Sequence, residues 1–491
     1  MKYALMIITI LPTIAWAHEV RIGSKKFTES VILGEIVRLT AKQCSLKTDH
    51  KKELGGTRIL WSALLNGDID IYPEYTGTIR EEILSGKRFK NFVEIEDYLK
   101  NRDISVISPL GFNNTYILGM MKSRARELNI EKISDLNKFP DLILGFGNEF
   151  MNRGDGWLAL KKTYMLTHKN IRGLDHDLAY RGLISGSIDV MDLYATDAEI
   201  EYYDLKVLED DKKHFPEYNA LLLYRSELND KAKSFISAIS NLRNRIDDNK
   251  MIQMNSMVKL LGMPSDQVAA DFLNSEFQFN IKTKKSHLWV RFKKNTSEHI
   301  FLVLISLSAA ILLAIPLGIF SVYHKKAGHL ILSIAGVIQT IPSLAILVFM
   351  IPLLGIGAGP AMMALFLYSL LPIIRNTYSG IMDIPGHLIE SADALGLTKM
   401  EKLRFLELPL AARSILSGIK IAAVINVGVA TLGALIGAGG YGQPILTGIR
   451  LDDFTLILEG AIPAALLALL FQGAFDLLEK LVVSRGLRFN D

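Results

Sequence analysis

Side chains that could perform chemistry are sparse in this sequence. His176 lies between Asp175 and Asp177, a combination more typical of a solvated turn than of a catalytic base or a metal ligand. No clear pair of histidines stands at metal-binding spacing, and no segment matches G-x-x-x-x-G-K-[ST], the loop whose backbone amides bind nucleotide phosphates. Cys44 is the only cysteine, so an intramolecular disulfide is excluded. We therefore expect no catalytic residue, no metal and no cofactor, and any ATP hydrolysis must come from another chain.

A charged segment over residues 390–409, ESADALGLTKMEKLRFLELP, lies between uncharged runs long enough to cross a bilayer. Its first part is amphipathic at helical spacing and is interrupted by Gly396. A second charged helix is expected over residues 399–408, ended by Pro409. Two short helices joined at a glycine make a rigid elbow that fits a partner's groove, although a surface hairpin on the membrane is the alternative.

The spacing of this segment resembles the cytoplasmic EAA loop of ABC importer permeases, which docks onto the ATPase subunit. The shared pattern is E-x-A, a glycine six residues after the glutamate, and a Leu-x-Leu-Pro group ten to thirteen residues after the glycine. The resemblance implies a cytoplasmic ABC ATPase as partner and a coupling role for five residues: Glu390, Ala392, Gly396, Leu406 and Pro409.

The apolar residues are unevenly distributed along the 491-residue chain. They make up 49% of it, and a mean hydropathy of +0.25 is high for a soluble enzyme. Roughly the first 295 residues indicate a soluble domain and the rest a membrane domain. The net charge of +4 is explained by membrane topology and requires no nucleic-acid partner.

The N-terminus predicts a secretory signal peptide over residues 1–17. Lys2 precedes an apolar run over residues 3–14 that is short for a membrane span, and Ala15-Trp16-Ala17 supplies the small residues of a cleavage site. We expect cleavage after Ala17, with an uncleaved anchor helix as the alternative. Either outcome would place the following domain outside the cytoplasm.

Five membrane spans are expected in an all-α permease domain over residues 299–491, with the coupling loop at 386–412. The spans are residues 300–323, two within 330–374 divided by a glycine-rich segment, 421–449 and 456–478. Lysines and arginines concentrate in the segments that would be cytoplasmic, whereas the outer loops between spans hold only Arg450. A basic linker over residues 278–298 precedes the first span and is expected near lipid headgroups.

The exported part, residues 18–277, alternates short apolar strands with amphipathic helices and is therefore expected to be α/β. A first lobe over residues 20–109 would be completed by a return segment after about Ala220, with a second lobe inserted between them. This arrangement is typical of two-lobed periplasmic binding proteins of the type II kind, which close around a solute by a hinge. Strands are expected within residues 104–112, 141–147 and 187–197.

Several motifs in both parts carry a more specific resemblance. The exported part contains GSKKFTES, GGTRILWSALLNGDIDIYPEYTGT, GFNNTY, RGDG, SGSIDVMDLYATD and HFPEY, and the membrane part contains IQTIPSLAILVFMIPLLGIG and LPIIRNTYSGI. They are similar to the substrate-binding domains and permeases of osmoprotectant importers for glycine betaine, choline or carnitine. The resemblance covers nearly the whole mature chain. It implies that one bacterial inner-membrane protein fuses a periplasmic binding domain to its permease, which would pair as a homodimer.

The resemblance also implies the ligand site. A quaternary ammonium cannot donate a hydrogen bond, so its recognition depends on aromatic faces, each contributing about 0.5–2 kcal/mol. The motif positions that would supply these faces are Tyr75, Tyr116, Tyr194 and Tyr218. A ligand carboxylate would be bound by Lys25, Thr78 and Arg153. Each tyrosine could instead be an ordinary core aromatic.

Two departures from the family pattern leave the cargo open. Ala195 and Ala198 replace the Ser and Gly that the family commonly carries, and Trp157 follows the RGDG turn. Ergothioneine, another betaine, or a different amine or amino acid is therefore the alternative cargo. A membrane-anchored sensor is a remote alternative, but a sensor should carry a cytoplasmic signalling domain and only a few residues follow the last expected span. A periplasmic enzyme is another remote alternative, and the lack of a clear nucleophile, base or metal cluster in the sequence disfavours it.

Overall fold

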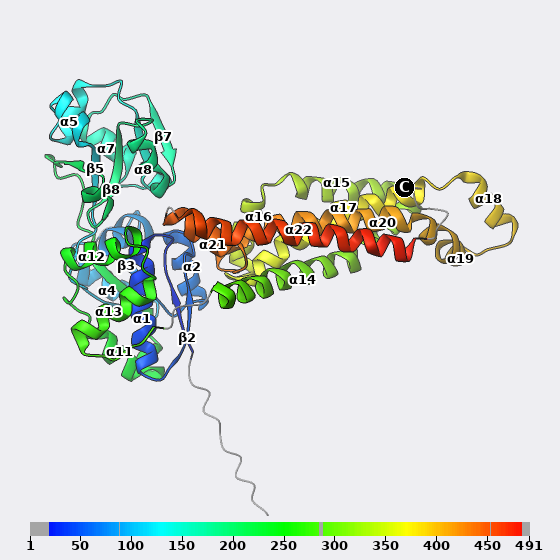
Figure 1. The fold of residues 1–491 in the computed structure, drawn as a ribbon, viewed down its shortest axis with the longest axis horizontal. Helices are drawn as coiled ribbons and strands as arrows, with labels where there is room; N and C mark the ends of the chain where they lie inside the picture. The colour runs from blue at the N-terminus through cyan, green and yellow to red at the C-terminus, as the bar shows by residue number, and fades with distance from the viewer. Residues whose placement is uncertain (1–18, 88, 284–287, 452, 484–491) are drawn as a thin grey trace, which may run out of the picture.

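The structure is a computed structural model that describes residues 19–87, 89–283, 288–451 and 453–483. The expected signal peptide lies outside the described residues. Figure 1 shows an α/β part made of two lobes at one end of the molecule and a long bundle of helices that extends away from it. This agrees with the expected fold class of a two-lobed binding domain followed by a helical permease domain.

Lobe 1 is built around a five-stranded sheet in the order β2-β1-β3-β10-β4. The chain leaves this lobe after β4 and returns with β10, which pairs antiparallel with both β3 and β4. The return segment therefore begins where the sequence predicts it, at Ala220. The strands are β1 (Glu19–Gly23), β2 (Lys47–Lys51), β3 (Ile71–Tyr75), β4 (Ile104–Ile107) and β10 (Ala220–Arg225). The helices include α1 (Thr28–Gln43), α2 (Thr57–Asn66), α4 (Phe92–Lys100), α11 (Lys233–Ser240), α12 (Asp248–Lys259) and α13 (Ser265–Phe277).

Lobe 2 is the inserted lobe, with a sheet in the order β7-β6-β8-β5-β9. Its β5 pairs antiparallel with β8 and β9, while β6 runs parallel to β7 and β8. The strands are β5 (Tyr116–Met121), β6 (Leu144–Gly147), β7 (Ile171–Leu174), β8 (Val190–Tyr194) and β9 (Leu205–Leu208). The helices include α5 (Lys122–Leu128), α6 (Asn148–Asn152), α7 (Trp157–Tyr164), α8 (His176–Ile184) and α9 (Glu199–Tyr202). A bridge between Asn113 and Asn219 ties the two crossing segments together.

Pro73 explains how the end of β3 is presented to the cleft. Every residue of β3 is buried, yet β3 pairs with β1 only at Ile71. Proline has no backbone N–H to donate, so the ladder with β1 cannot continue through Pro73. The side chains of the last two residues of the strand instead contact the start of α1 and the segment before it: Glu74 pairs with Lys25, and the Tyr75 hydroxyl donates to Glu29.

The helical part has four helices long and apolar enough to cross a membrane among the described residues, or up to five if a bent pair counts as one span. This agrees with the expected number. The bent pair is α15 (Lys325–Thr340) and α16 (Ser343–Leu354), which meet at 100°. The Tyr368 hydroxyl donates to the Ile341 carbonyl at the bend, so this backbone group remains paired in the bundle. The other long helices are α14 (Leu288–Tyr323), α17 (Ala358–Met382), α20 (Leu408–Ala430) and α22 (Phe454–Val482).

The bounds of two expected elements differ from the structure. The fourth span, expected over residues 421–449, is part of a helix over Lys399–Ile436, and a separate short helix α21 (Gly442–Arg450) follows it. The break lies at Gly437, Gly439 and Gly440, all with positive φ, where residues other than glycine are strained. In addition, α14 begins at Leu288, within the range expected as linker.

Pro409 does not end the second elbow helix, so that expectation is wrong. The residue lies near the start of α20, directly after a π-helical turn over Leu403–Glu407. The wider turn accommodates the missing N–H and the proline ring without ending the helix. The elbow therefore continues directly into a membrane helix.

Candidate functional site: the cleft between the lobes and the coupling elbow

Three of the four candidate tyrosines form one ring cluster at the cleft. Tyr116 begins β5 and lies opposite Tyr194, the last residue of β8, in the antiparallel register. Their ring centroids are 5.1 Å apart, and Tyr218 meets Tyr116 edge-on at 5.6 Å. Residues directly opposite on adjacent strands place their side chains together on one face, which explains how motifs far apart in sequence converge here.

Phe27 joins the fourth tyrosine to this cluster. Its ring stacks on Tyr75 of lobe 1 at 6.2 Å and on Tyr194 of lobe 2 at 5.7 Å. Phe27 is not among the residues predicted for the site. The available signal is its position in GSKKFTES, where an aromatic side chain directly precedes the first turn of α1. The aromatic surface thus spans both lobes.

The residues expected to bind a ligand carboxylate are close to the cluster but already have acidic partners. Arg153 lies over the rings of Tyr116 and Tyr218 and forms a bidentate pair with Asp155, at 2.9 and 3.0 Å. Lys25 Nζ lies 2.5 Å from a carboxylate oxygen of Glu74. Thr78 is buried at the end of the short helix α3 (Thr76–Thr78). A ligand carboxylate would therefore compete with protein carboxylates for both cations.

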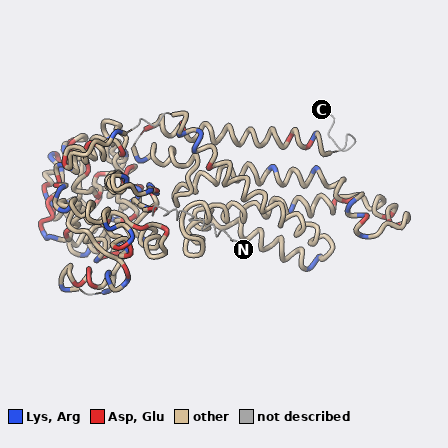
Figure 2. The backbone as a smooth tube through the Cα atoms, turned by 90° about the horizontal axis from the view of Figure 1, so that it is seen from below, with Lys and Arg blue, Asp and Glu red and all other residues tan. Residues whose placement is uncertain are grey.

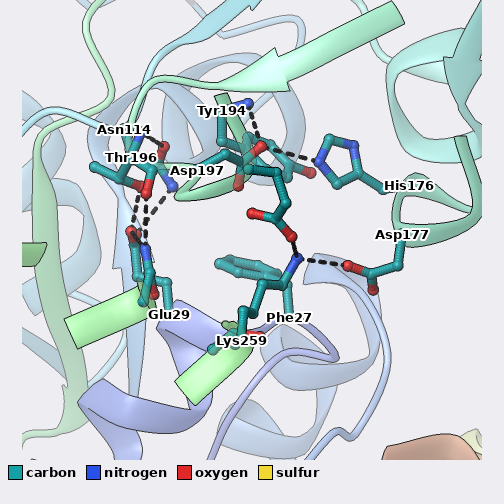
Figure 3. A pocket seen from close by; sticks show the side chains of 12 residues that line it. Phe27, Glu29, Asn114, His176, Asp177, Tyr194, Thr196, Asp197 and Lys259 are labelled. Atoms are coloured by element: carbon teal, nitrogen blue, oxygen red, sulfur yellow. Dashed lines mark hydrogen bonds and ion pairs between the residues drawn. The ribbon is translucent and has the colours of Figure 1, made fainter. Parts of the chain in front are cut away.

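A hollow of about 320 Å³ lies between the lobes beside the aromatic cluster (Figure 3). Tyr194 is the only predicted site residue that lines it, and Phe27 supplies a second aromatic face. Most of the remaining lining is polar or charged. The lining residues are Phe27, Thr28, Glu29, Asn114, His176, Asp177, Tyr194, Thr196, Asp197, Glu199, Asn255 and Lys259.

Glu29 is the buried centre of a hydrogen-bond network that crosses the cleft. Its carboxylate accepts from the Tyr75 hydroxyl at 2.5 Å, from Asn114 at 2.9 Å and from Asn255 at 3.3 Å. The hydroxyl of Thr196, in lobe 2, also donates to it, as Figure 3 shows. Burial raises the pKa of Glu29 to about 7, although the bonds from Thr196, Tyr75 and Asn255 oppose the shift. This network ties the first turn of α1 to lobe 2.

His176 is not part of a solvated turn, so that expectation is wrong. Its side chain is only 16% exposed, and its nitrogens lie 3.6 Å from Asp192 and 3.2 Å from Asp197. Its ring centroid is 4.5 Å from that of Tyr194. Burial alone would lower the pKa of His176, but hydrogen bonds and charges from both carboxylates outweigh it and raise the pKa well above its usual range. His176 therefore packs against Tyr194 at the edge of the aromatic cluster while paired with two carboxylates.

Lys259 forms an ion-pair bridge across the cleft. It extends from α12 of lobe 1 and pairs with Asp177 at 2.8 Å and with Glu199, both in lobe 2. Burial would lower the pKa of Lys259, but the charges of Asp177 and Glu199 raise it above the ordinary lysine value. Asn255, one helical turn earlier, donates to the Thr196 carbonyl, so one face of α12 holds lobe 2 in place.

The coupling elbow is at the opposite end of the molecule from the lobes (Figure 1). Helix α18 (Gly386–Ala394) ends before Gly396, whose φ of 75° is left-handed. Thr398 and Glu401 then form a capping box that starts α19 (Lys399–Lys402). Lys402 pairs with Asp393 at 2.5 Å and closes the elbow.

The predicted coupling residues divide between the interior and the surface of this elbow. Ala392 is buried, Leu406 is half-buried, and Glu390, Gly396 and Pro409 are exposed. Three exposed apolar side chains that the motif did not single out extend the surface: Leu395, Met400 and Phe405. Exposed apolar side chains beside charged ones are suited to a protein partner.

Both parts of the chain match known families. Residues 18–275 match the substrate binding domain of the ABC-type glycine betaine transport system, and residues 310–485 match the binding-protein-dependent transport system inner membrane component. The choline transport system permease protein OpuBB of Bacillus subtilis (strain 168) is 43% identical over 193 residues, which are 39% of this chain and 89% of OpuBB. The osmoprotectant import permease protein OsmY of Salmonella typhimurium is 47% identical over 174 residues, 35% of this chain and 74% of OsmY. A solved structure of a glycine betaine/carnitine/choline ABC transporter is 31% identical, covers 53% of this chain and 100% of that chain, and has a TM-score of 0.46.

These matches define a subunit of a binding-protein-dependent ABC importer, a multi-pass inner-membrane protein with its binding domain in the periplasm. The first match covers more than half of the chain. The protein belongs to the osmoprotectant ABC importer family and fuses the substrate-binding domain to the permease of one system. A permease of this kind requires an ATPase partner and a small-molecule substrate.

Proposed function

We propose that the tethered domain binds a quaternary ammonium solute, of the glycine betaine, choline and carnitine class, and delivers it to the fused permease. The observation that carries the proposal is the convergence of Tyr75, Tyr116, Tyr194 and Tyr218 with Phe27 on one aromatic surface shared by both lobes. Several aromatic faces around one point are suited to a cation that offers no hydrogen-bond donor. Choline and carnitine also stand in the names of the permeases that the membrane part is similar to.

The transport cycle is alternating access. The binding domain closes on the solute by a hinge and docks on the outer face of a permease homodimer. ATP is hydrolysed by a cytoplasmic partner chain, which engages the elbow over residues 390–409 and opens the pathway outward. The basic residues before the first span contact lipid headgroups. In this scheme the mature chain begins after a signal peptide over residues 1–17, and the binding domain, linker and permease occupy 18–277, 278–298 and 299–491.

Within this class, a cation without a carboxylate, such as choline, differs from the zwitterions in what it requires of Lys25 and Arg153. Lys25 and Arg153 are both paired with acidic side chains, and the same two cations lie over the rings of Tyr75, Tyr116 and Tyr218, so a ligand ammonium group competes with them for these faces. A zwitterion such as glycine betaine, carnitine or ergothioneine has to displace Glu74 or Asp155 from these cations, and choline does not. The two cargo types therefore make different demands on the same cleft.

Calorimetry on the purified full chain in nanodiscs tests the assignment. We expect one of glycine betaine, choline, carnitine or ergothioneine to bind, and we expect Tyr116→Ala and Tyr194→Ala each to weaken it at least tenfold because each removes a cation–π face. Tyr98→Ala is the matched control, since Tyr98 also has cations over its ring but lies on α4 away from the cleft. Absence of binding to all four solutes would remove the quaternary ammonium assignment and leave the importer architecture in place.

A further inference from the structure

The end of α21 reaches from the permease into lobe 1 of the binding domain. Arg450 donates from Nε and Nη2 to one carboxylate oxygen of Glu53, at 3.1 and 2.8 Å, and from Nη1 to the Thr28 hydroxyl at 2.9 Å. Thr447, one turn earlier on α21, donates to the same carboxylate at 3.1 Å. Figure 1 shows α21 at the end of the bundle that faces the lobes.

This contact is buried and has the features of a built interface. The side chains of Arg450 and Glu53 are each 5% exposed. A buried ion pair is tolerated when additional hydrogen bonds satisfy its remaining donors and acceptors, as Thr28 and Thr447 do here. Apolar packing continues beside it, since Leu54 of lobe 1 shares a buried cluster with Ile356 and Ile436 of the permease.

Thr28 lies between the two residues that connect α1 to the cleft. Phe27 stacks on Tyr75 and Tyr194, and Glu29 accepts the hydrogen bond from Thr196 in lobe 2. Three successive residues at the start of α1 therefore contact the aromatic cluster, the permease and the opposite lobe in turn. A displacement of this turn by the permease would act on the cluster and on the network across the cleft together.

A second hollow brings the same permease turn against the ion-pair bridge. About 430 Å³ in size, it is lined on one side by Ile449, Arg450 and Leu451 of the permease. On the other side it is lined by Asp177, Glu199 and Lys259, the three members of the bridge between the lobes. The permease turn thus borders both lobes at the point where an ion pair holds them together.

We propose that Arg450 is a positioning residue through which the permease holds the first turn of α1 and couples docking of the binding domain to closure of its lobes. The docking surface on the binding domain is the corner formed by Thr28 and Glu53. The proposal rests on the proposed function in that a bound solute is what closes the lobes. Because coupling free energies are reciprocal, a permease contact that favours closed lobes also strengthens solute binding.

A double-mutant cycle on the full chain in nanodiscs tests the coupling. We expect Arg450→Gln and Glu53→Gln each to weaken binding of the solute identified above by about threefold to tenfold, and to lower uptake in cells at least tenfold. The double variant should bind like either single variant, because both changes remove one contact. Arg450→Lys, which keeps the charge, should recover part of both losses, and Arg126→Gln, an exposed change on α5, should have no effect. Additive effects of the two substitutions, or unchanged affinity in both single variants, would overturn the proposal.

A cross-link supplies a readout that does not depend on the cargo. In a Cys44→Ser background, which has no other cysteine, Glu53→Cys and Thr447→Cys are expected to be joined by a short bis-maleimide in membranes, and neither single-cysteine variant should give this product. If the cross-link forms while none of the four solutes binds, the docking contact stands and the cargo assignment fails. If solute binds and no cross-link forms, the docking contact is overturned and the proposed function stands.

Discussion

The contacts in the cleft join residues far apart in sequence, whereas those in the elbow join residues close in sequence. Glu29 in the cleft accepts hydrogen bonds from Thr196 and Asn255, which lie 167 and 226 positions away. In the elbow, Thr398 caps Glu401 three positions on, and Lys402 pairs with Asp393 nine positions back. The bond from Thr196 to Glu29 can exist only while the lobes are together, whereas the elbow is a locally folded unit that can be displaced without being rearranged.

The two regions also differ in where their charges lie. The cleft buries carboxylates and cations between the lobes, so each depends on its partner for compensation. The elbow carries its charges in solvent and exposes apolar side chains beside them. Figure 2 shows the charged residues gathered on the two-lobed part and at the ends of the helices, with few along the bundle. Removing a charge should therefore weaken solute binding strongly in the cleft. In the elbow, a substitution that alters the backbone should impair transport more than one that removes a charge.

Lys259→Met should have the largest effect on the cleft. The variant removes the cation that pairs with both Asp177 and Glu199, and breaking a buried ion pair costs about 3–5 kcal/mol. Part of this cost is recovered by protonation, because burial already raises the pKa of Glu199. We expect solute affinity, measured by calorimetry on the full chain, to fall about a hundredfold.

Lys250→Met is the matched control for this change. Lys250 is on the same helix α12, but it pairs with Glu276 of the same lobe and is partly exposed. Its loss should leave affinity within about twofold of the parent chain, since exposed ion pairs contribute about 0–1 kcal/mol. Equal losses in the two variants would mean that the Lys259 bridge has no special role in closure.

Gly396→Val should affect the elbow alone, with a smaller effect. The φ of 75° is costly for a β-branched residue, by about 1–2 kcal/mol, although no atom lies within 4 Å of the added Cβ. The turn should open and shift α19, so that uptake and solute-stimulated ATPase activity fall about tenfold while solute affinity is unchanged. Gly386→Val introduces the same side chain into open space at an ordinary φ of the same elbow and should be tolerated. Full transport activity in Gly396→Val would argue against coupling through this turn.

This difference in sequence separation also explains which parts of the fold and of the candidate site can be predicted from the sequence. The elbow follows local rules, so its glycine break and the start of its second helix can be predicted from the sequence, whereas the π-helical turn and the continuation of the helix through Pro409 cannot. In the lobes, the inserted topology and the candidate tyrosines could be identified from motifs. The position of Phe27 in GSKKFTES is a weak signal, but its contacts and those of Glu29 and Thr196 arise only when strands and helices distant in sequence are brought together. The environment of His176 has the same cause, since Asp192 and Asp197 approach it from β8 and the segment that follows, which its own neighbours in sequence do not indicate.

The smallest expected effect is a pH dependence of closure carried by Glu29. Its pKa in the closed cleft is about 7, whereas that of an exposed glutamate is about 4.5, so the closed state holds a proton more tightly than the open state between these values. Stabilisation of closure by this proton is present at low pH and is lost as pH rises through about 7. The acidic partners of His176 and Lys259 raise both pKa values, which favours the cationic form of each side chain.

The pH dependence of solute affinity should be small, because opening of the lobes removes few of the hydrogen bonds to Glu29. Thr196 leaves with lobe 2, while Tyr75 and Asn255 remain with lobe 1 and keep the carboxylate hydrogen-bonded. We therefore expect solute affinity to fall about threefold between pH 5.5 and pH 8. In Glu29→Gln, which preserves the shape of the side chain and cannot ionise, calorimetry over the same range should show a flat profile. A profile that keeps its slope in this variant would assign the pH dependence to another group and would separate Glu29 from closure.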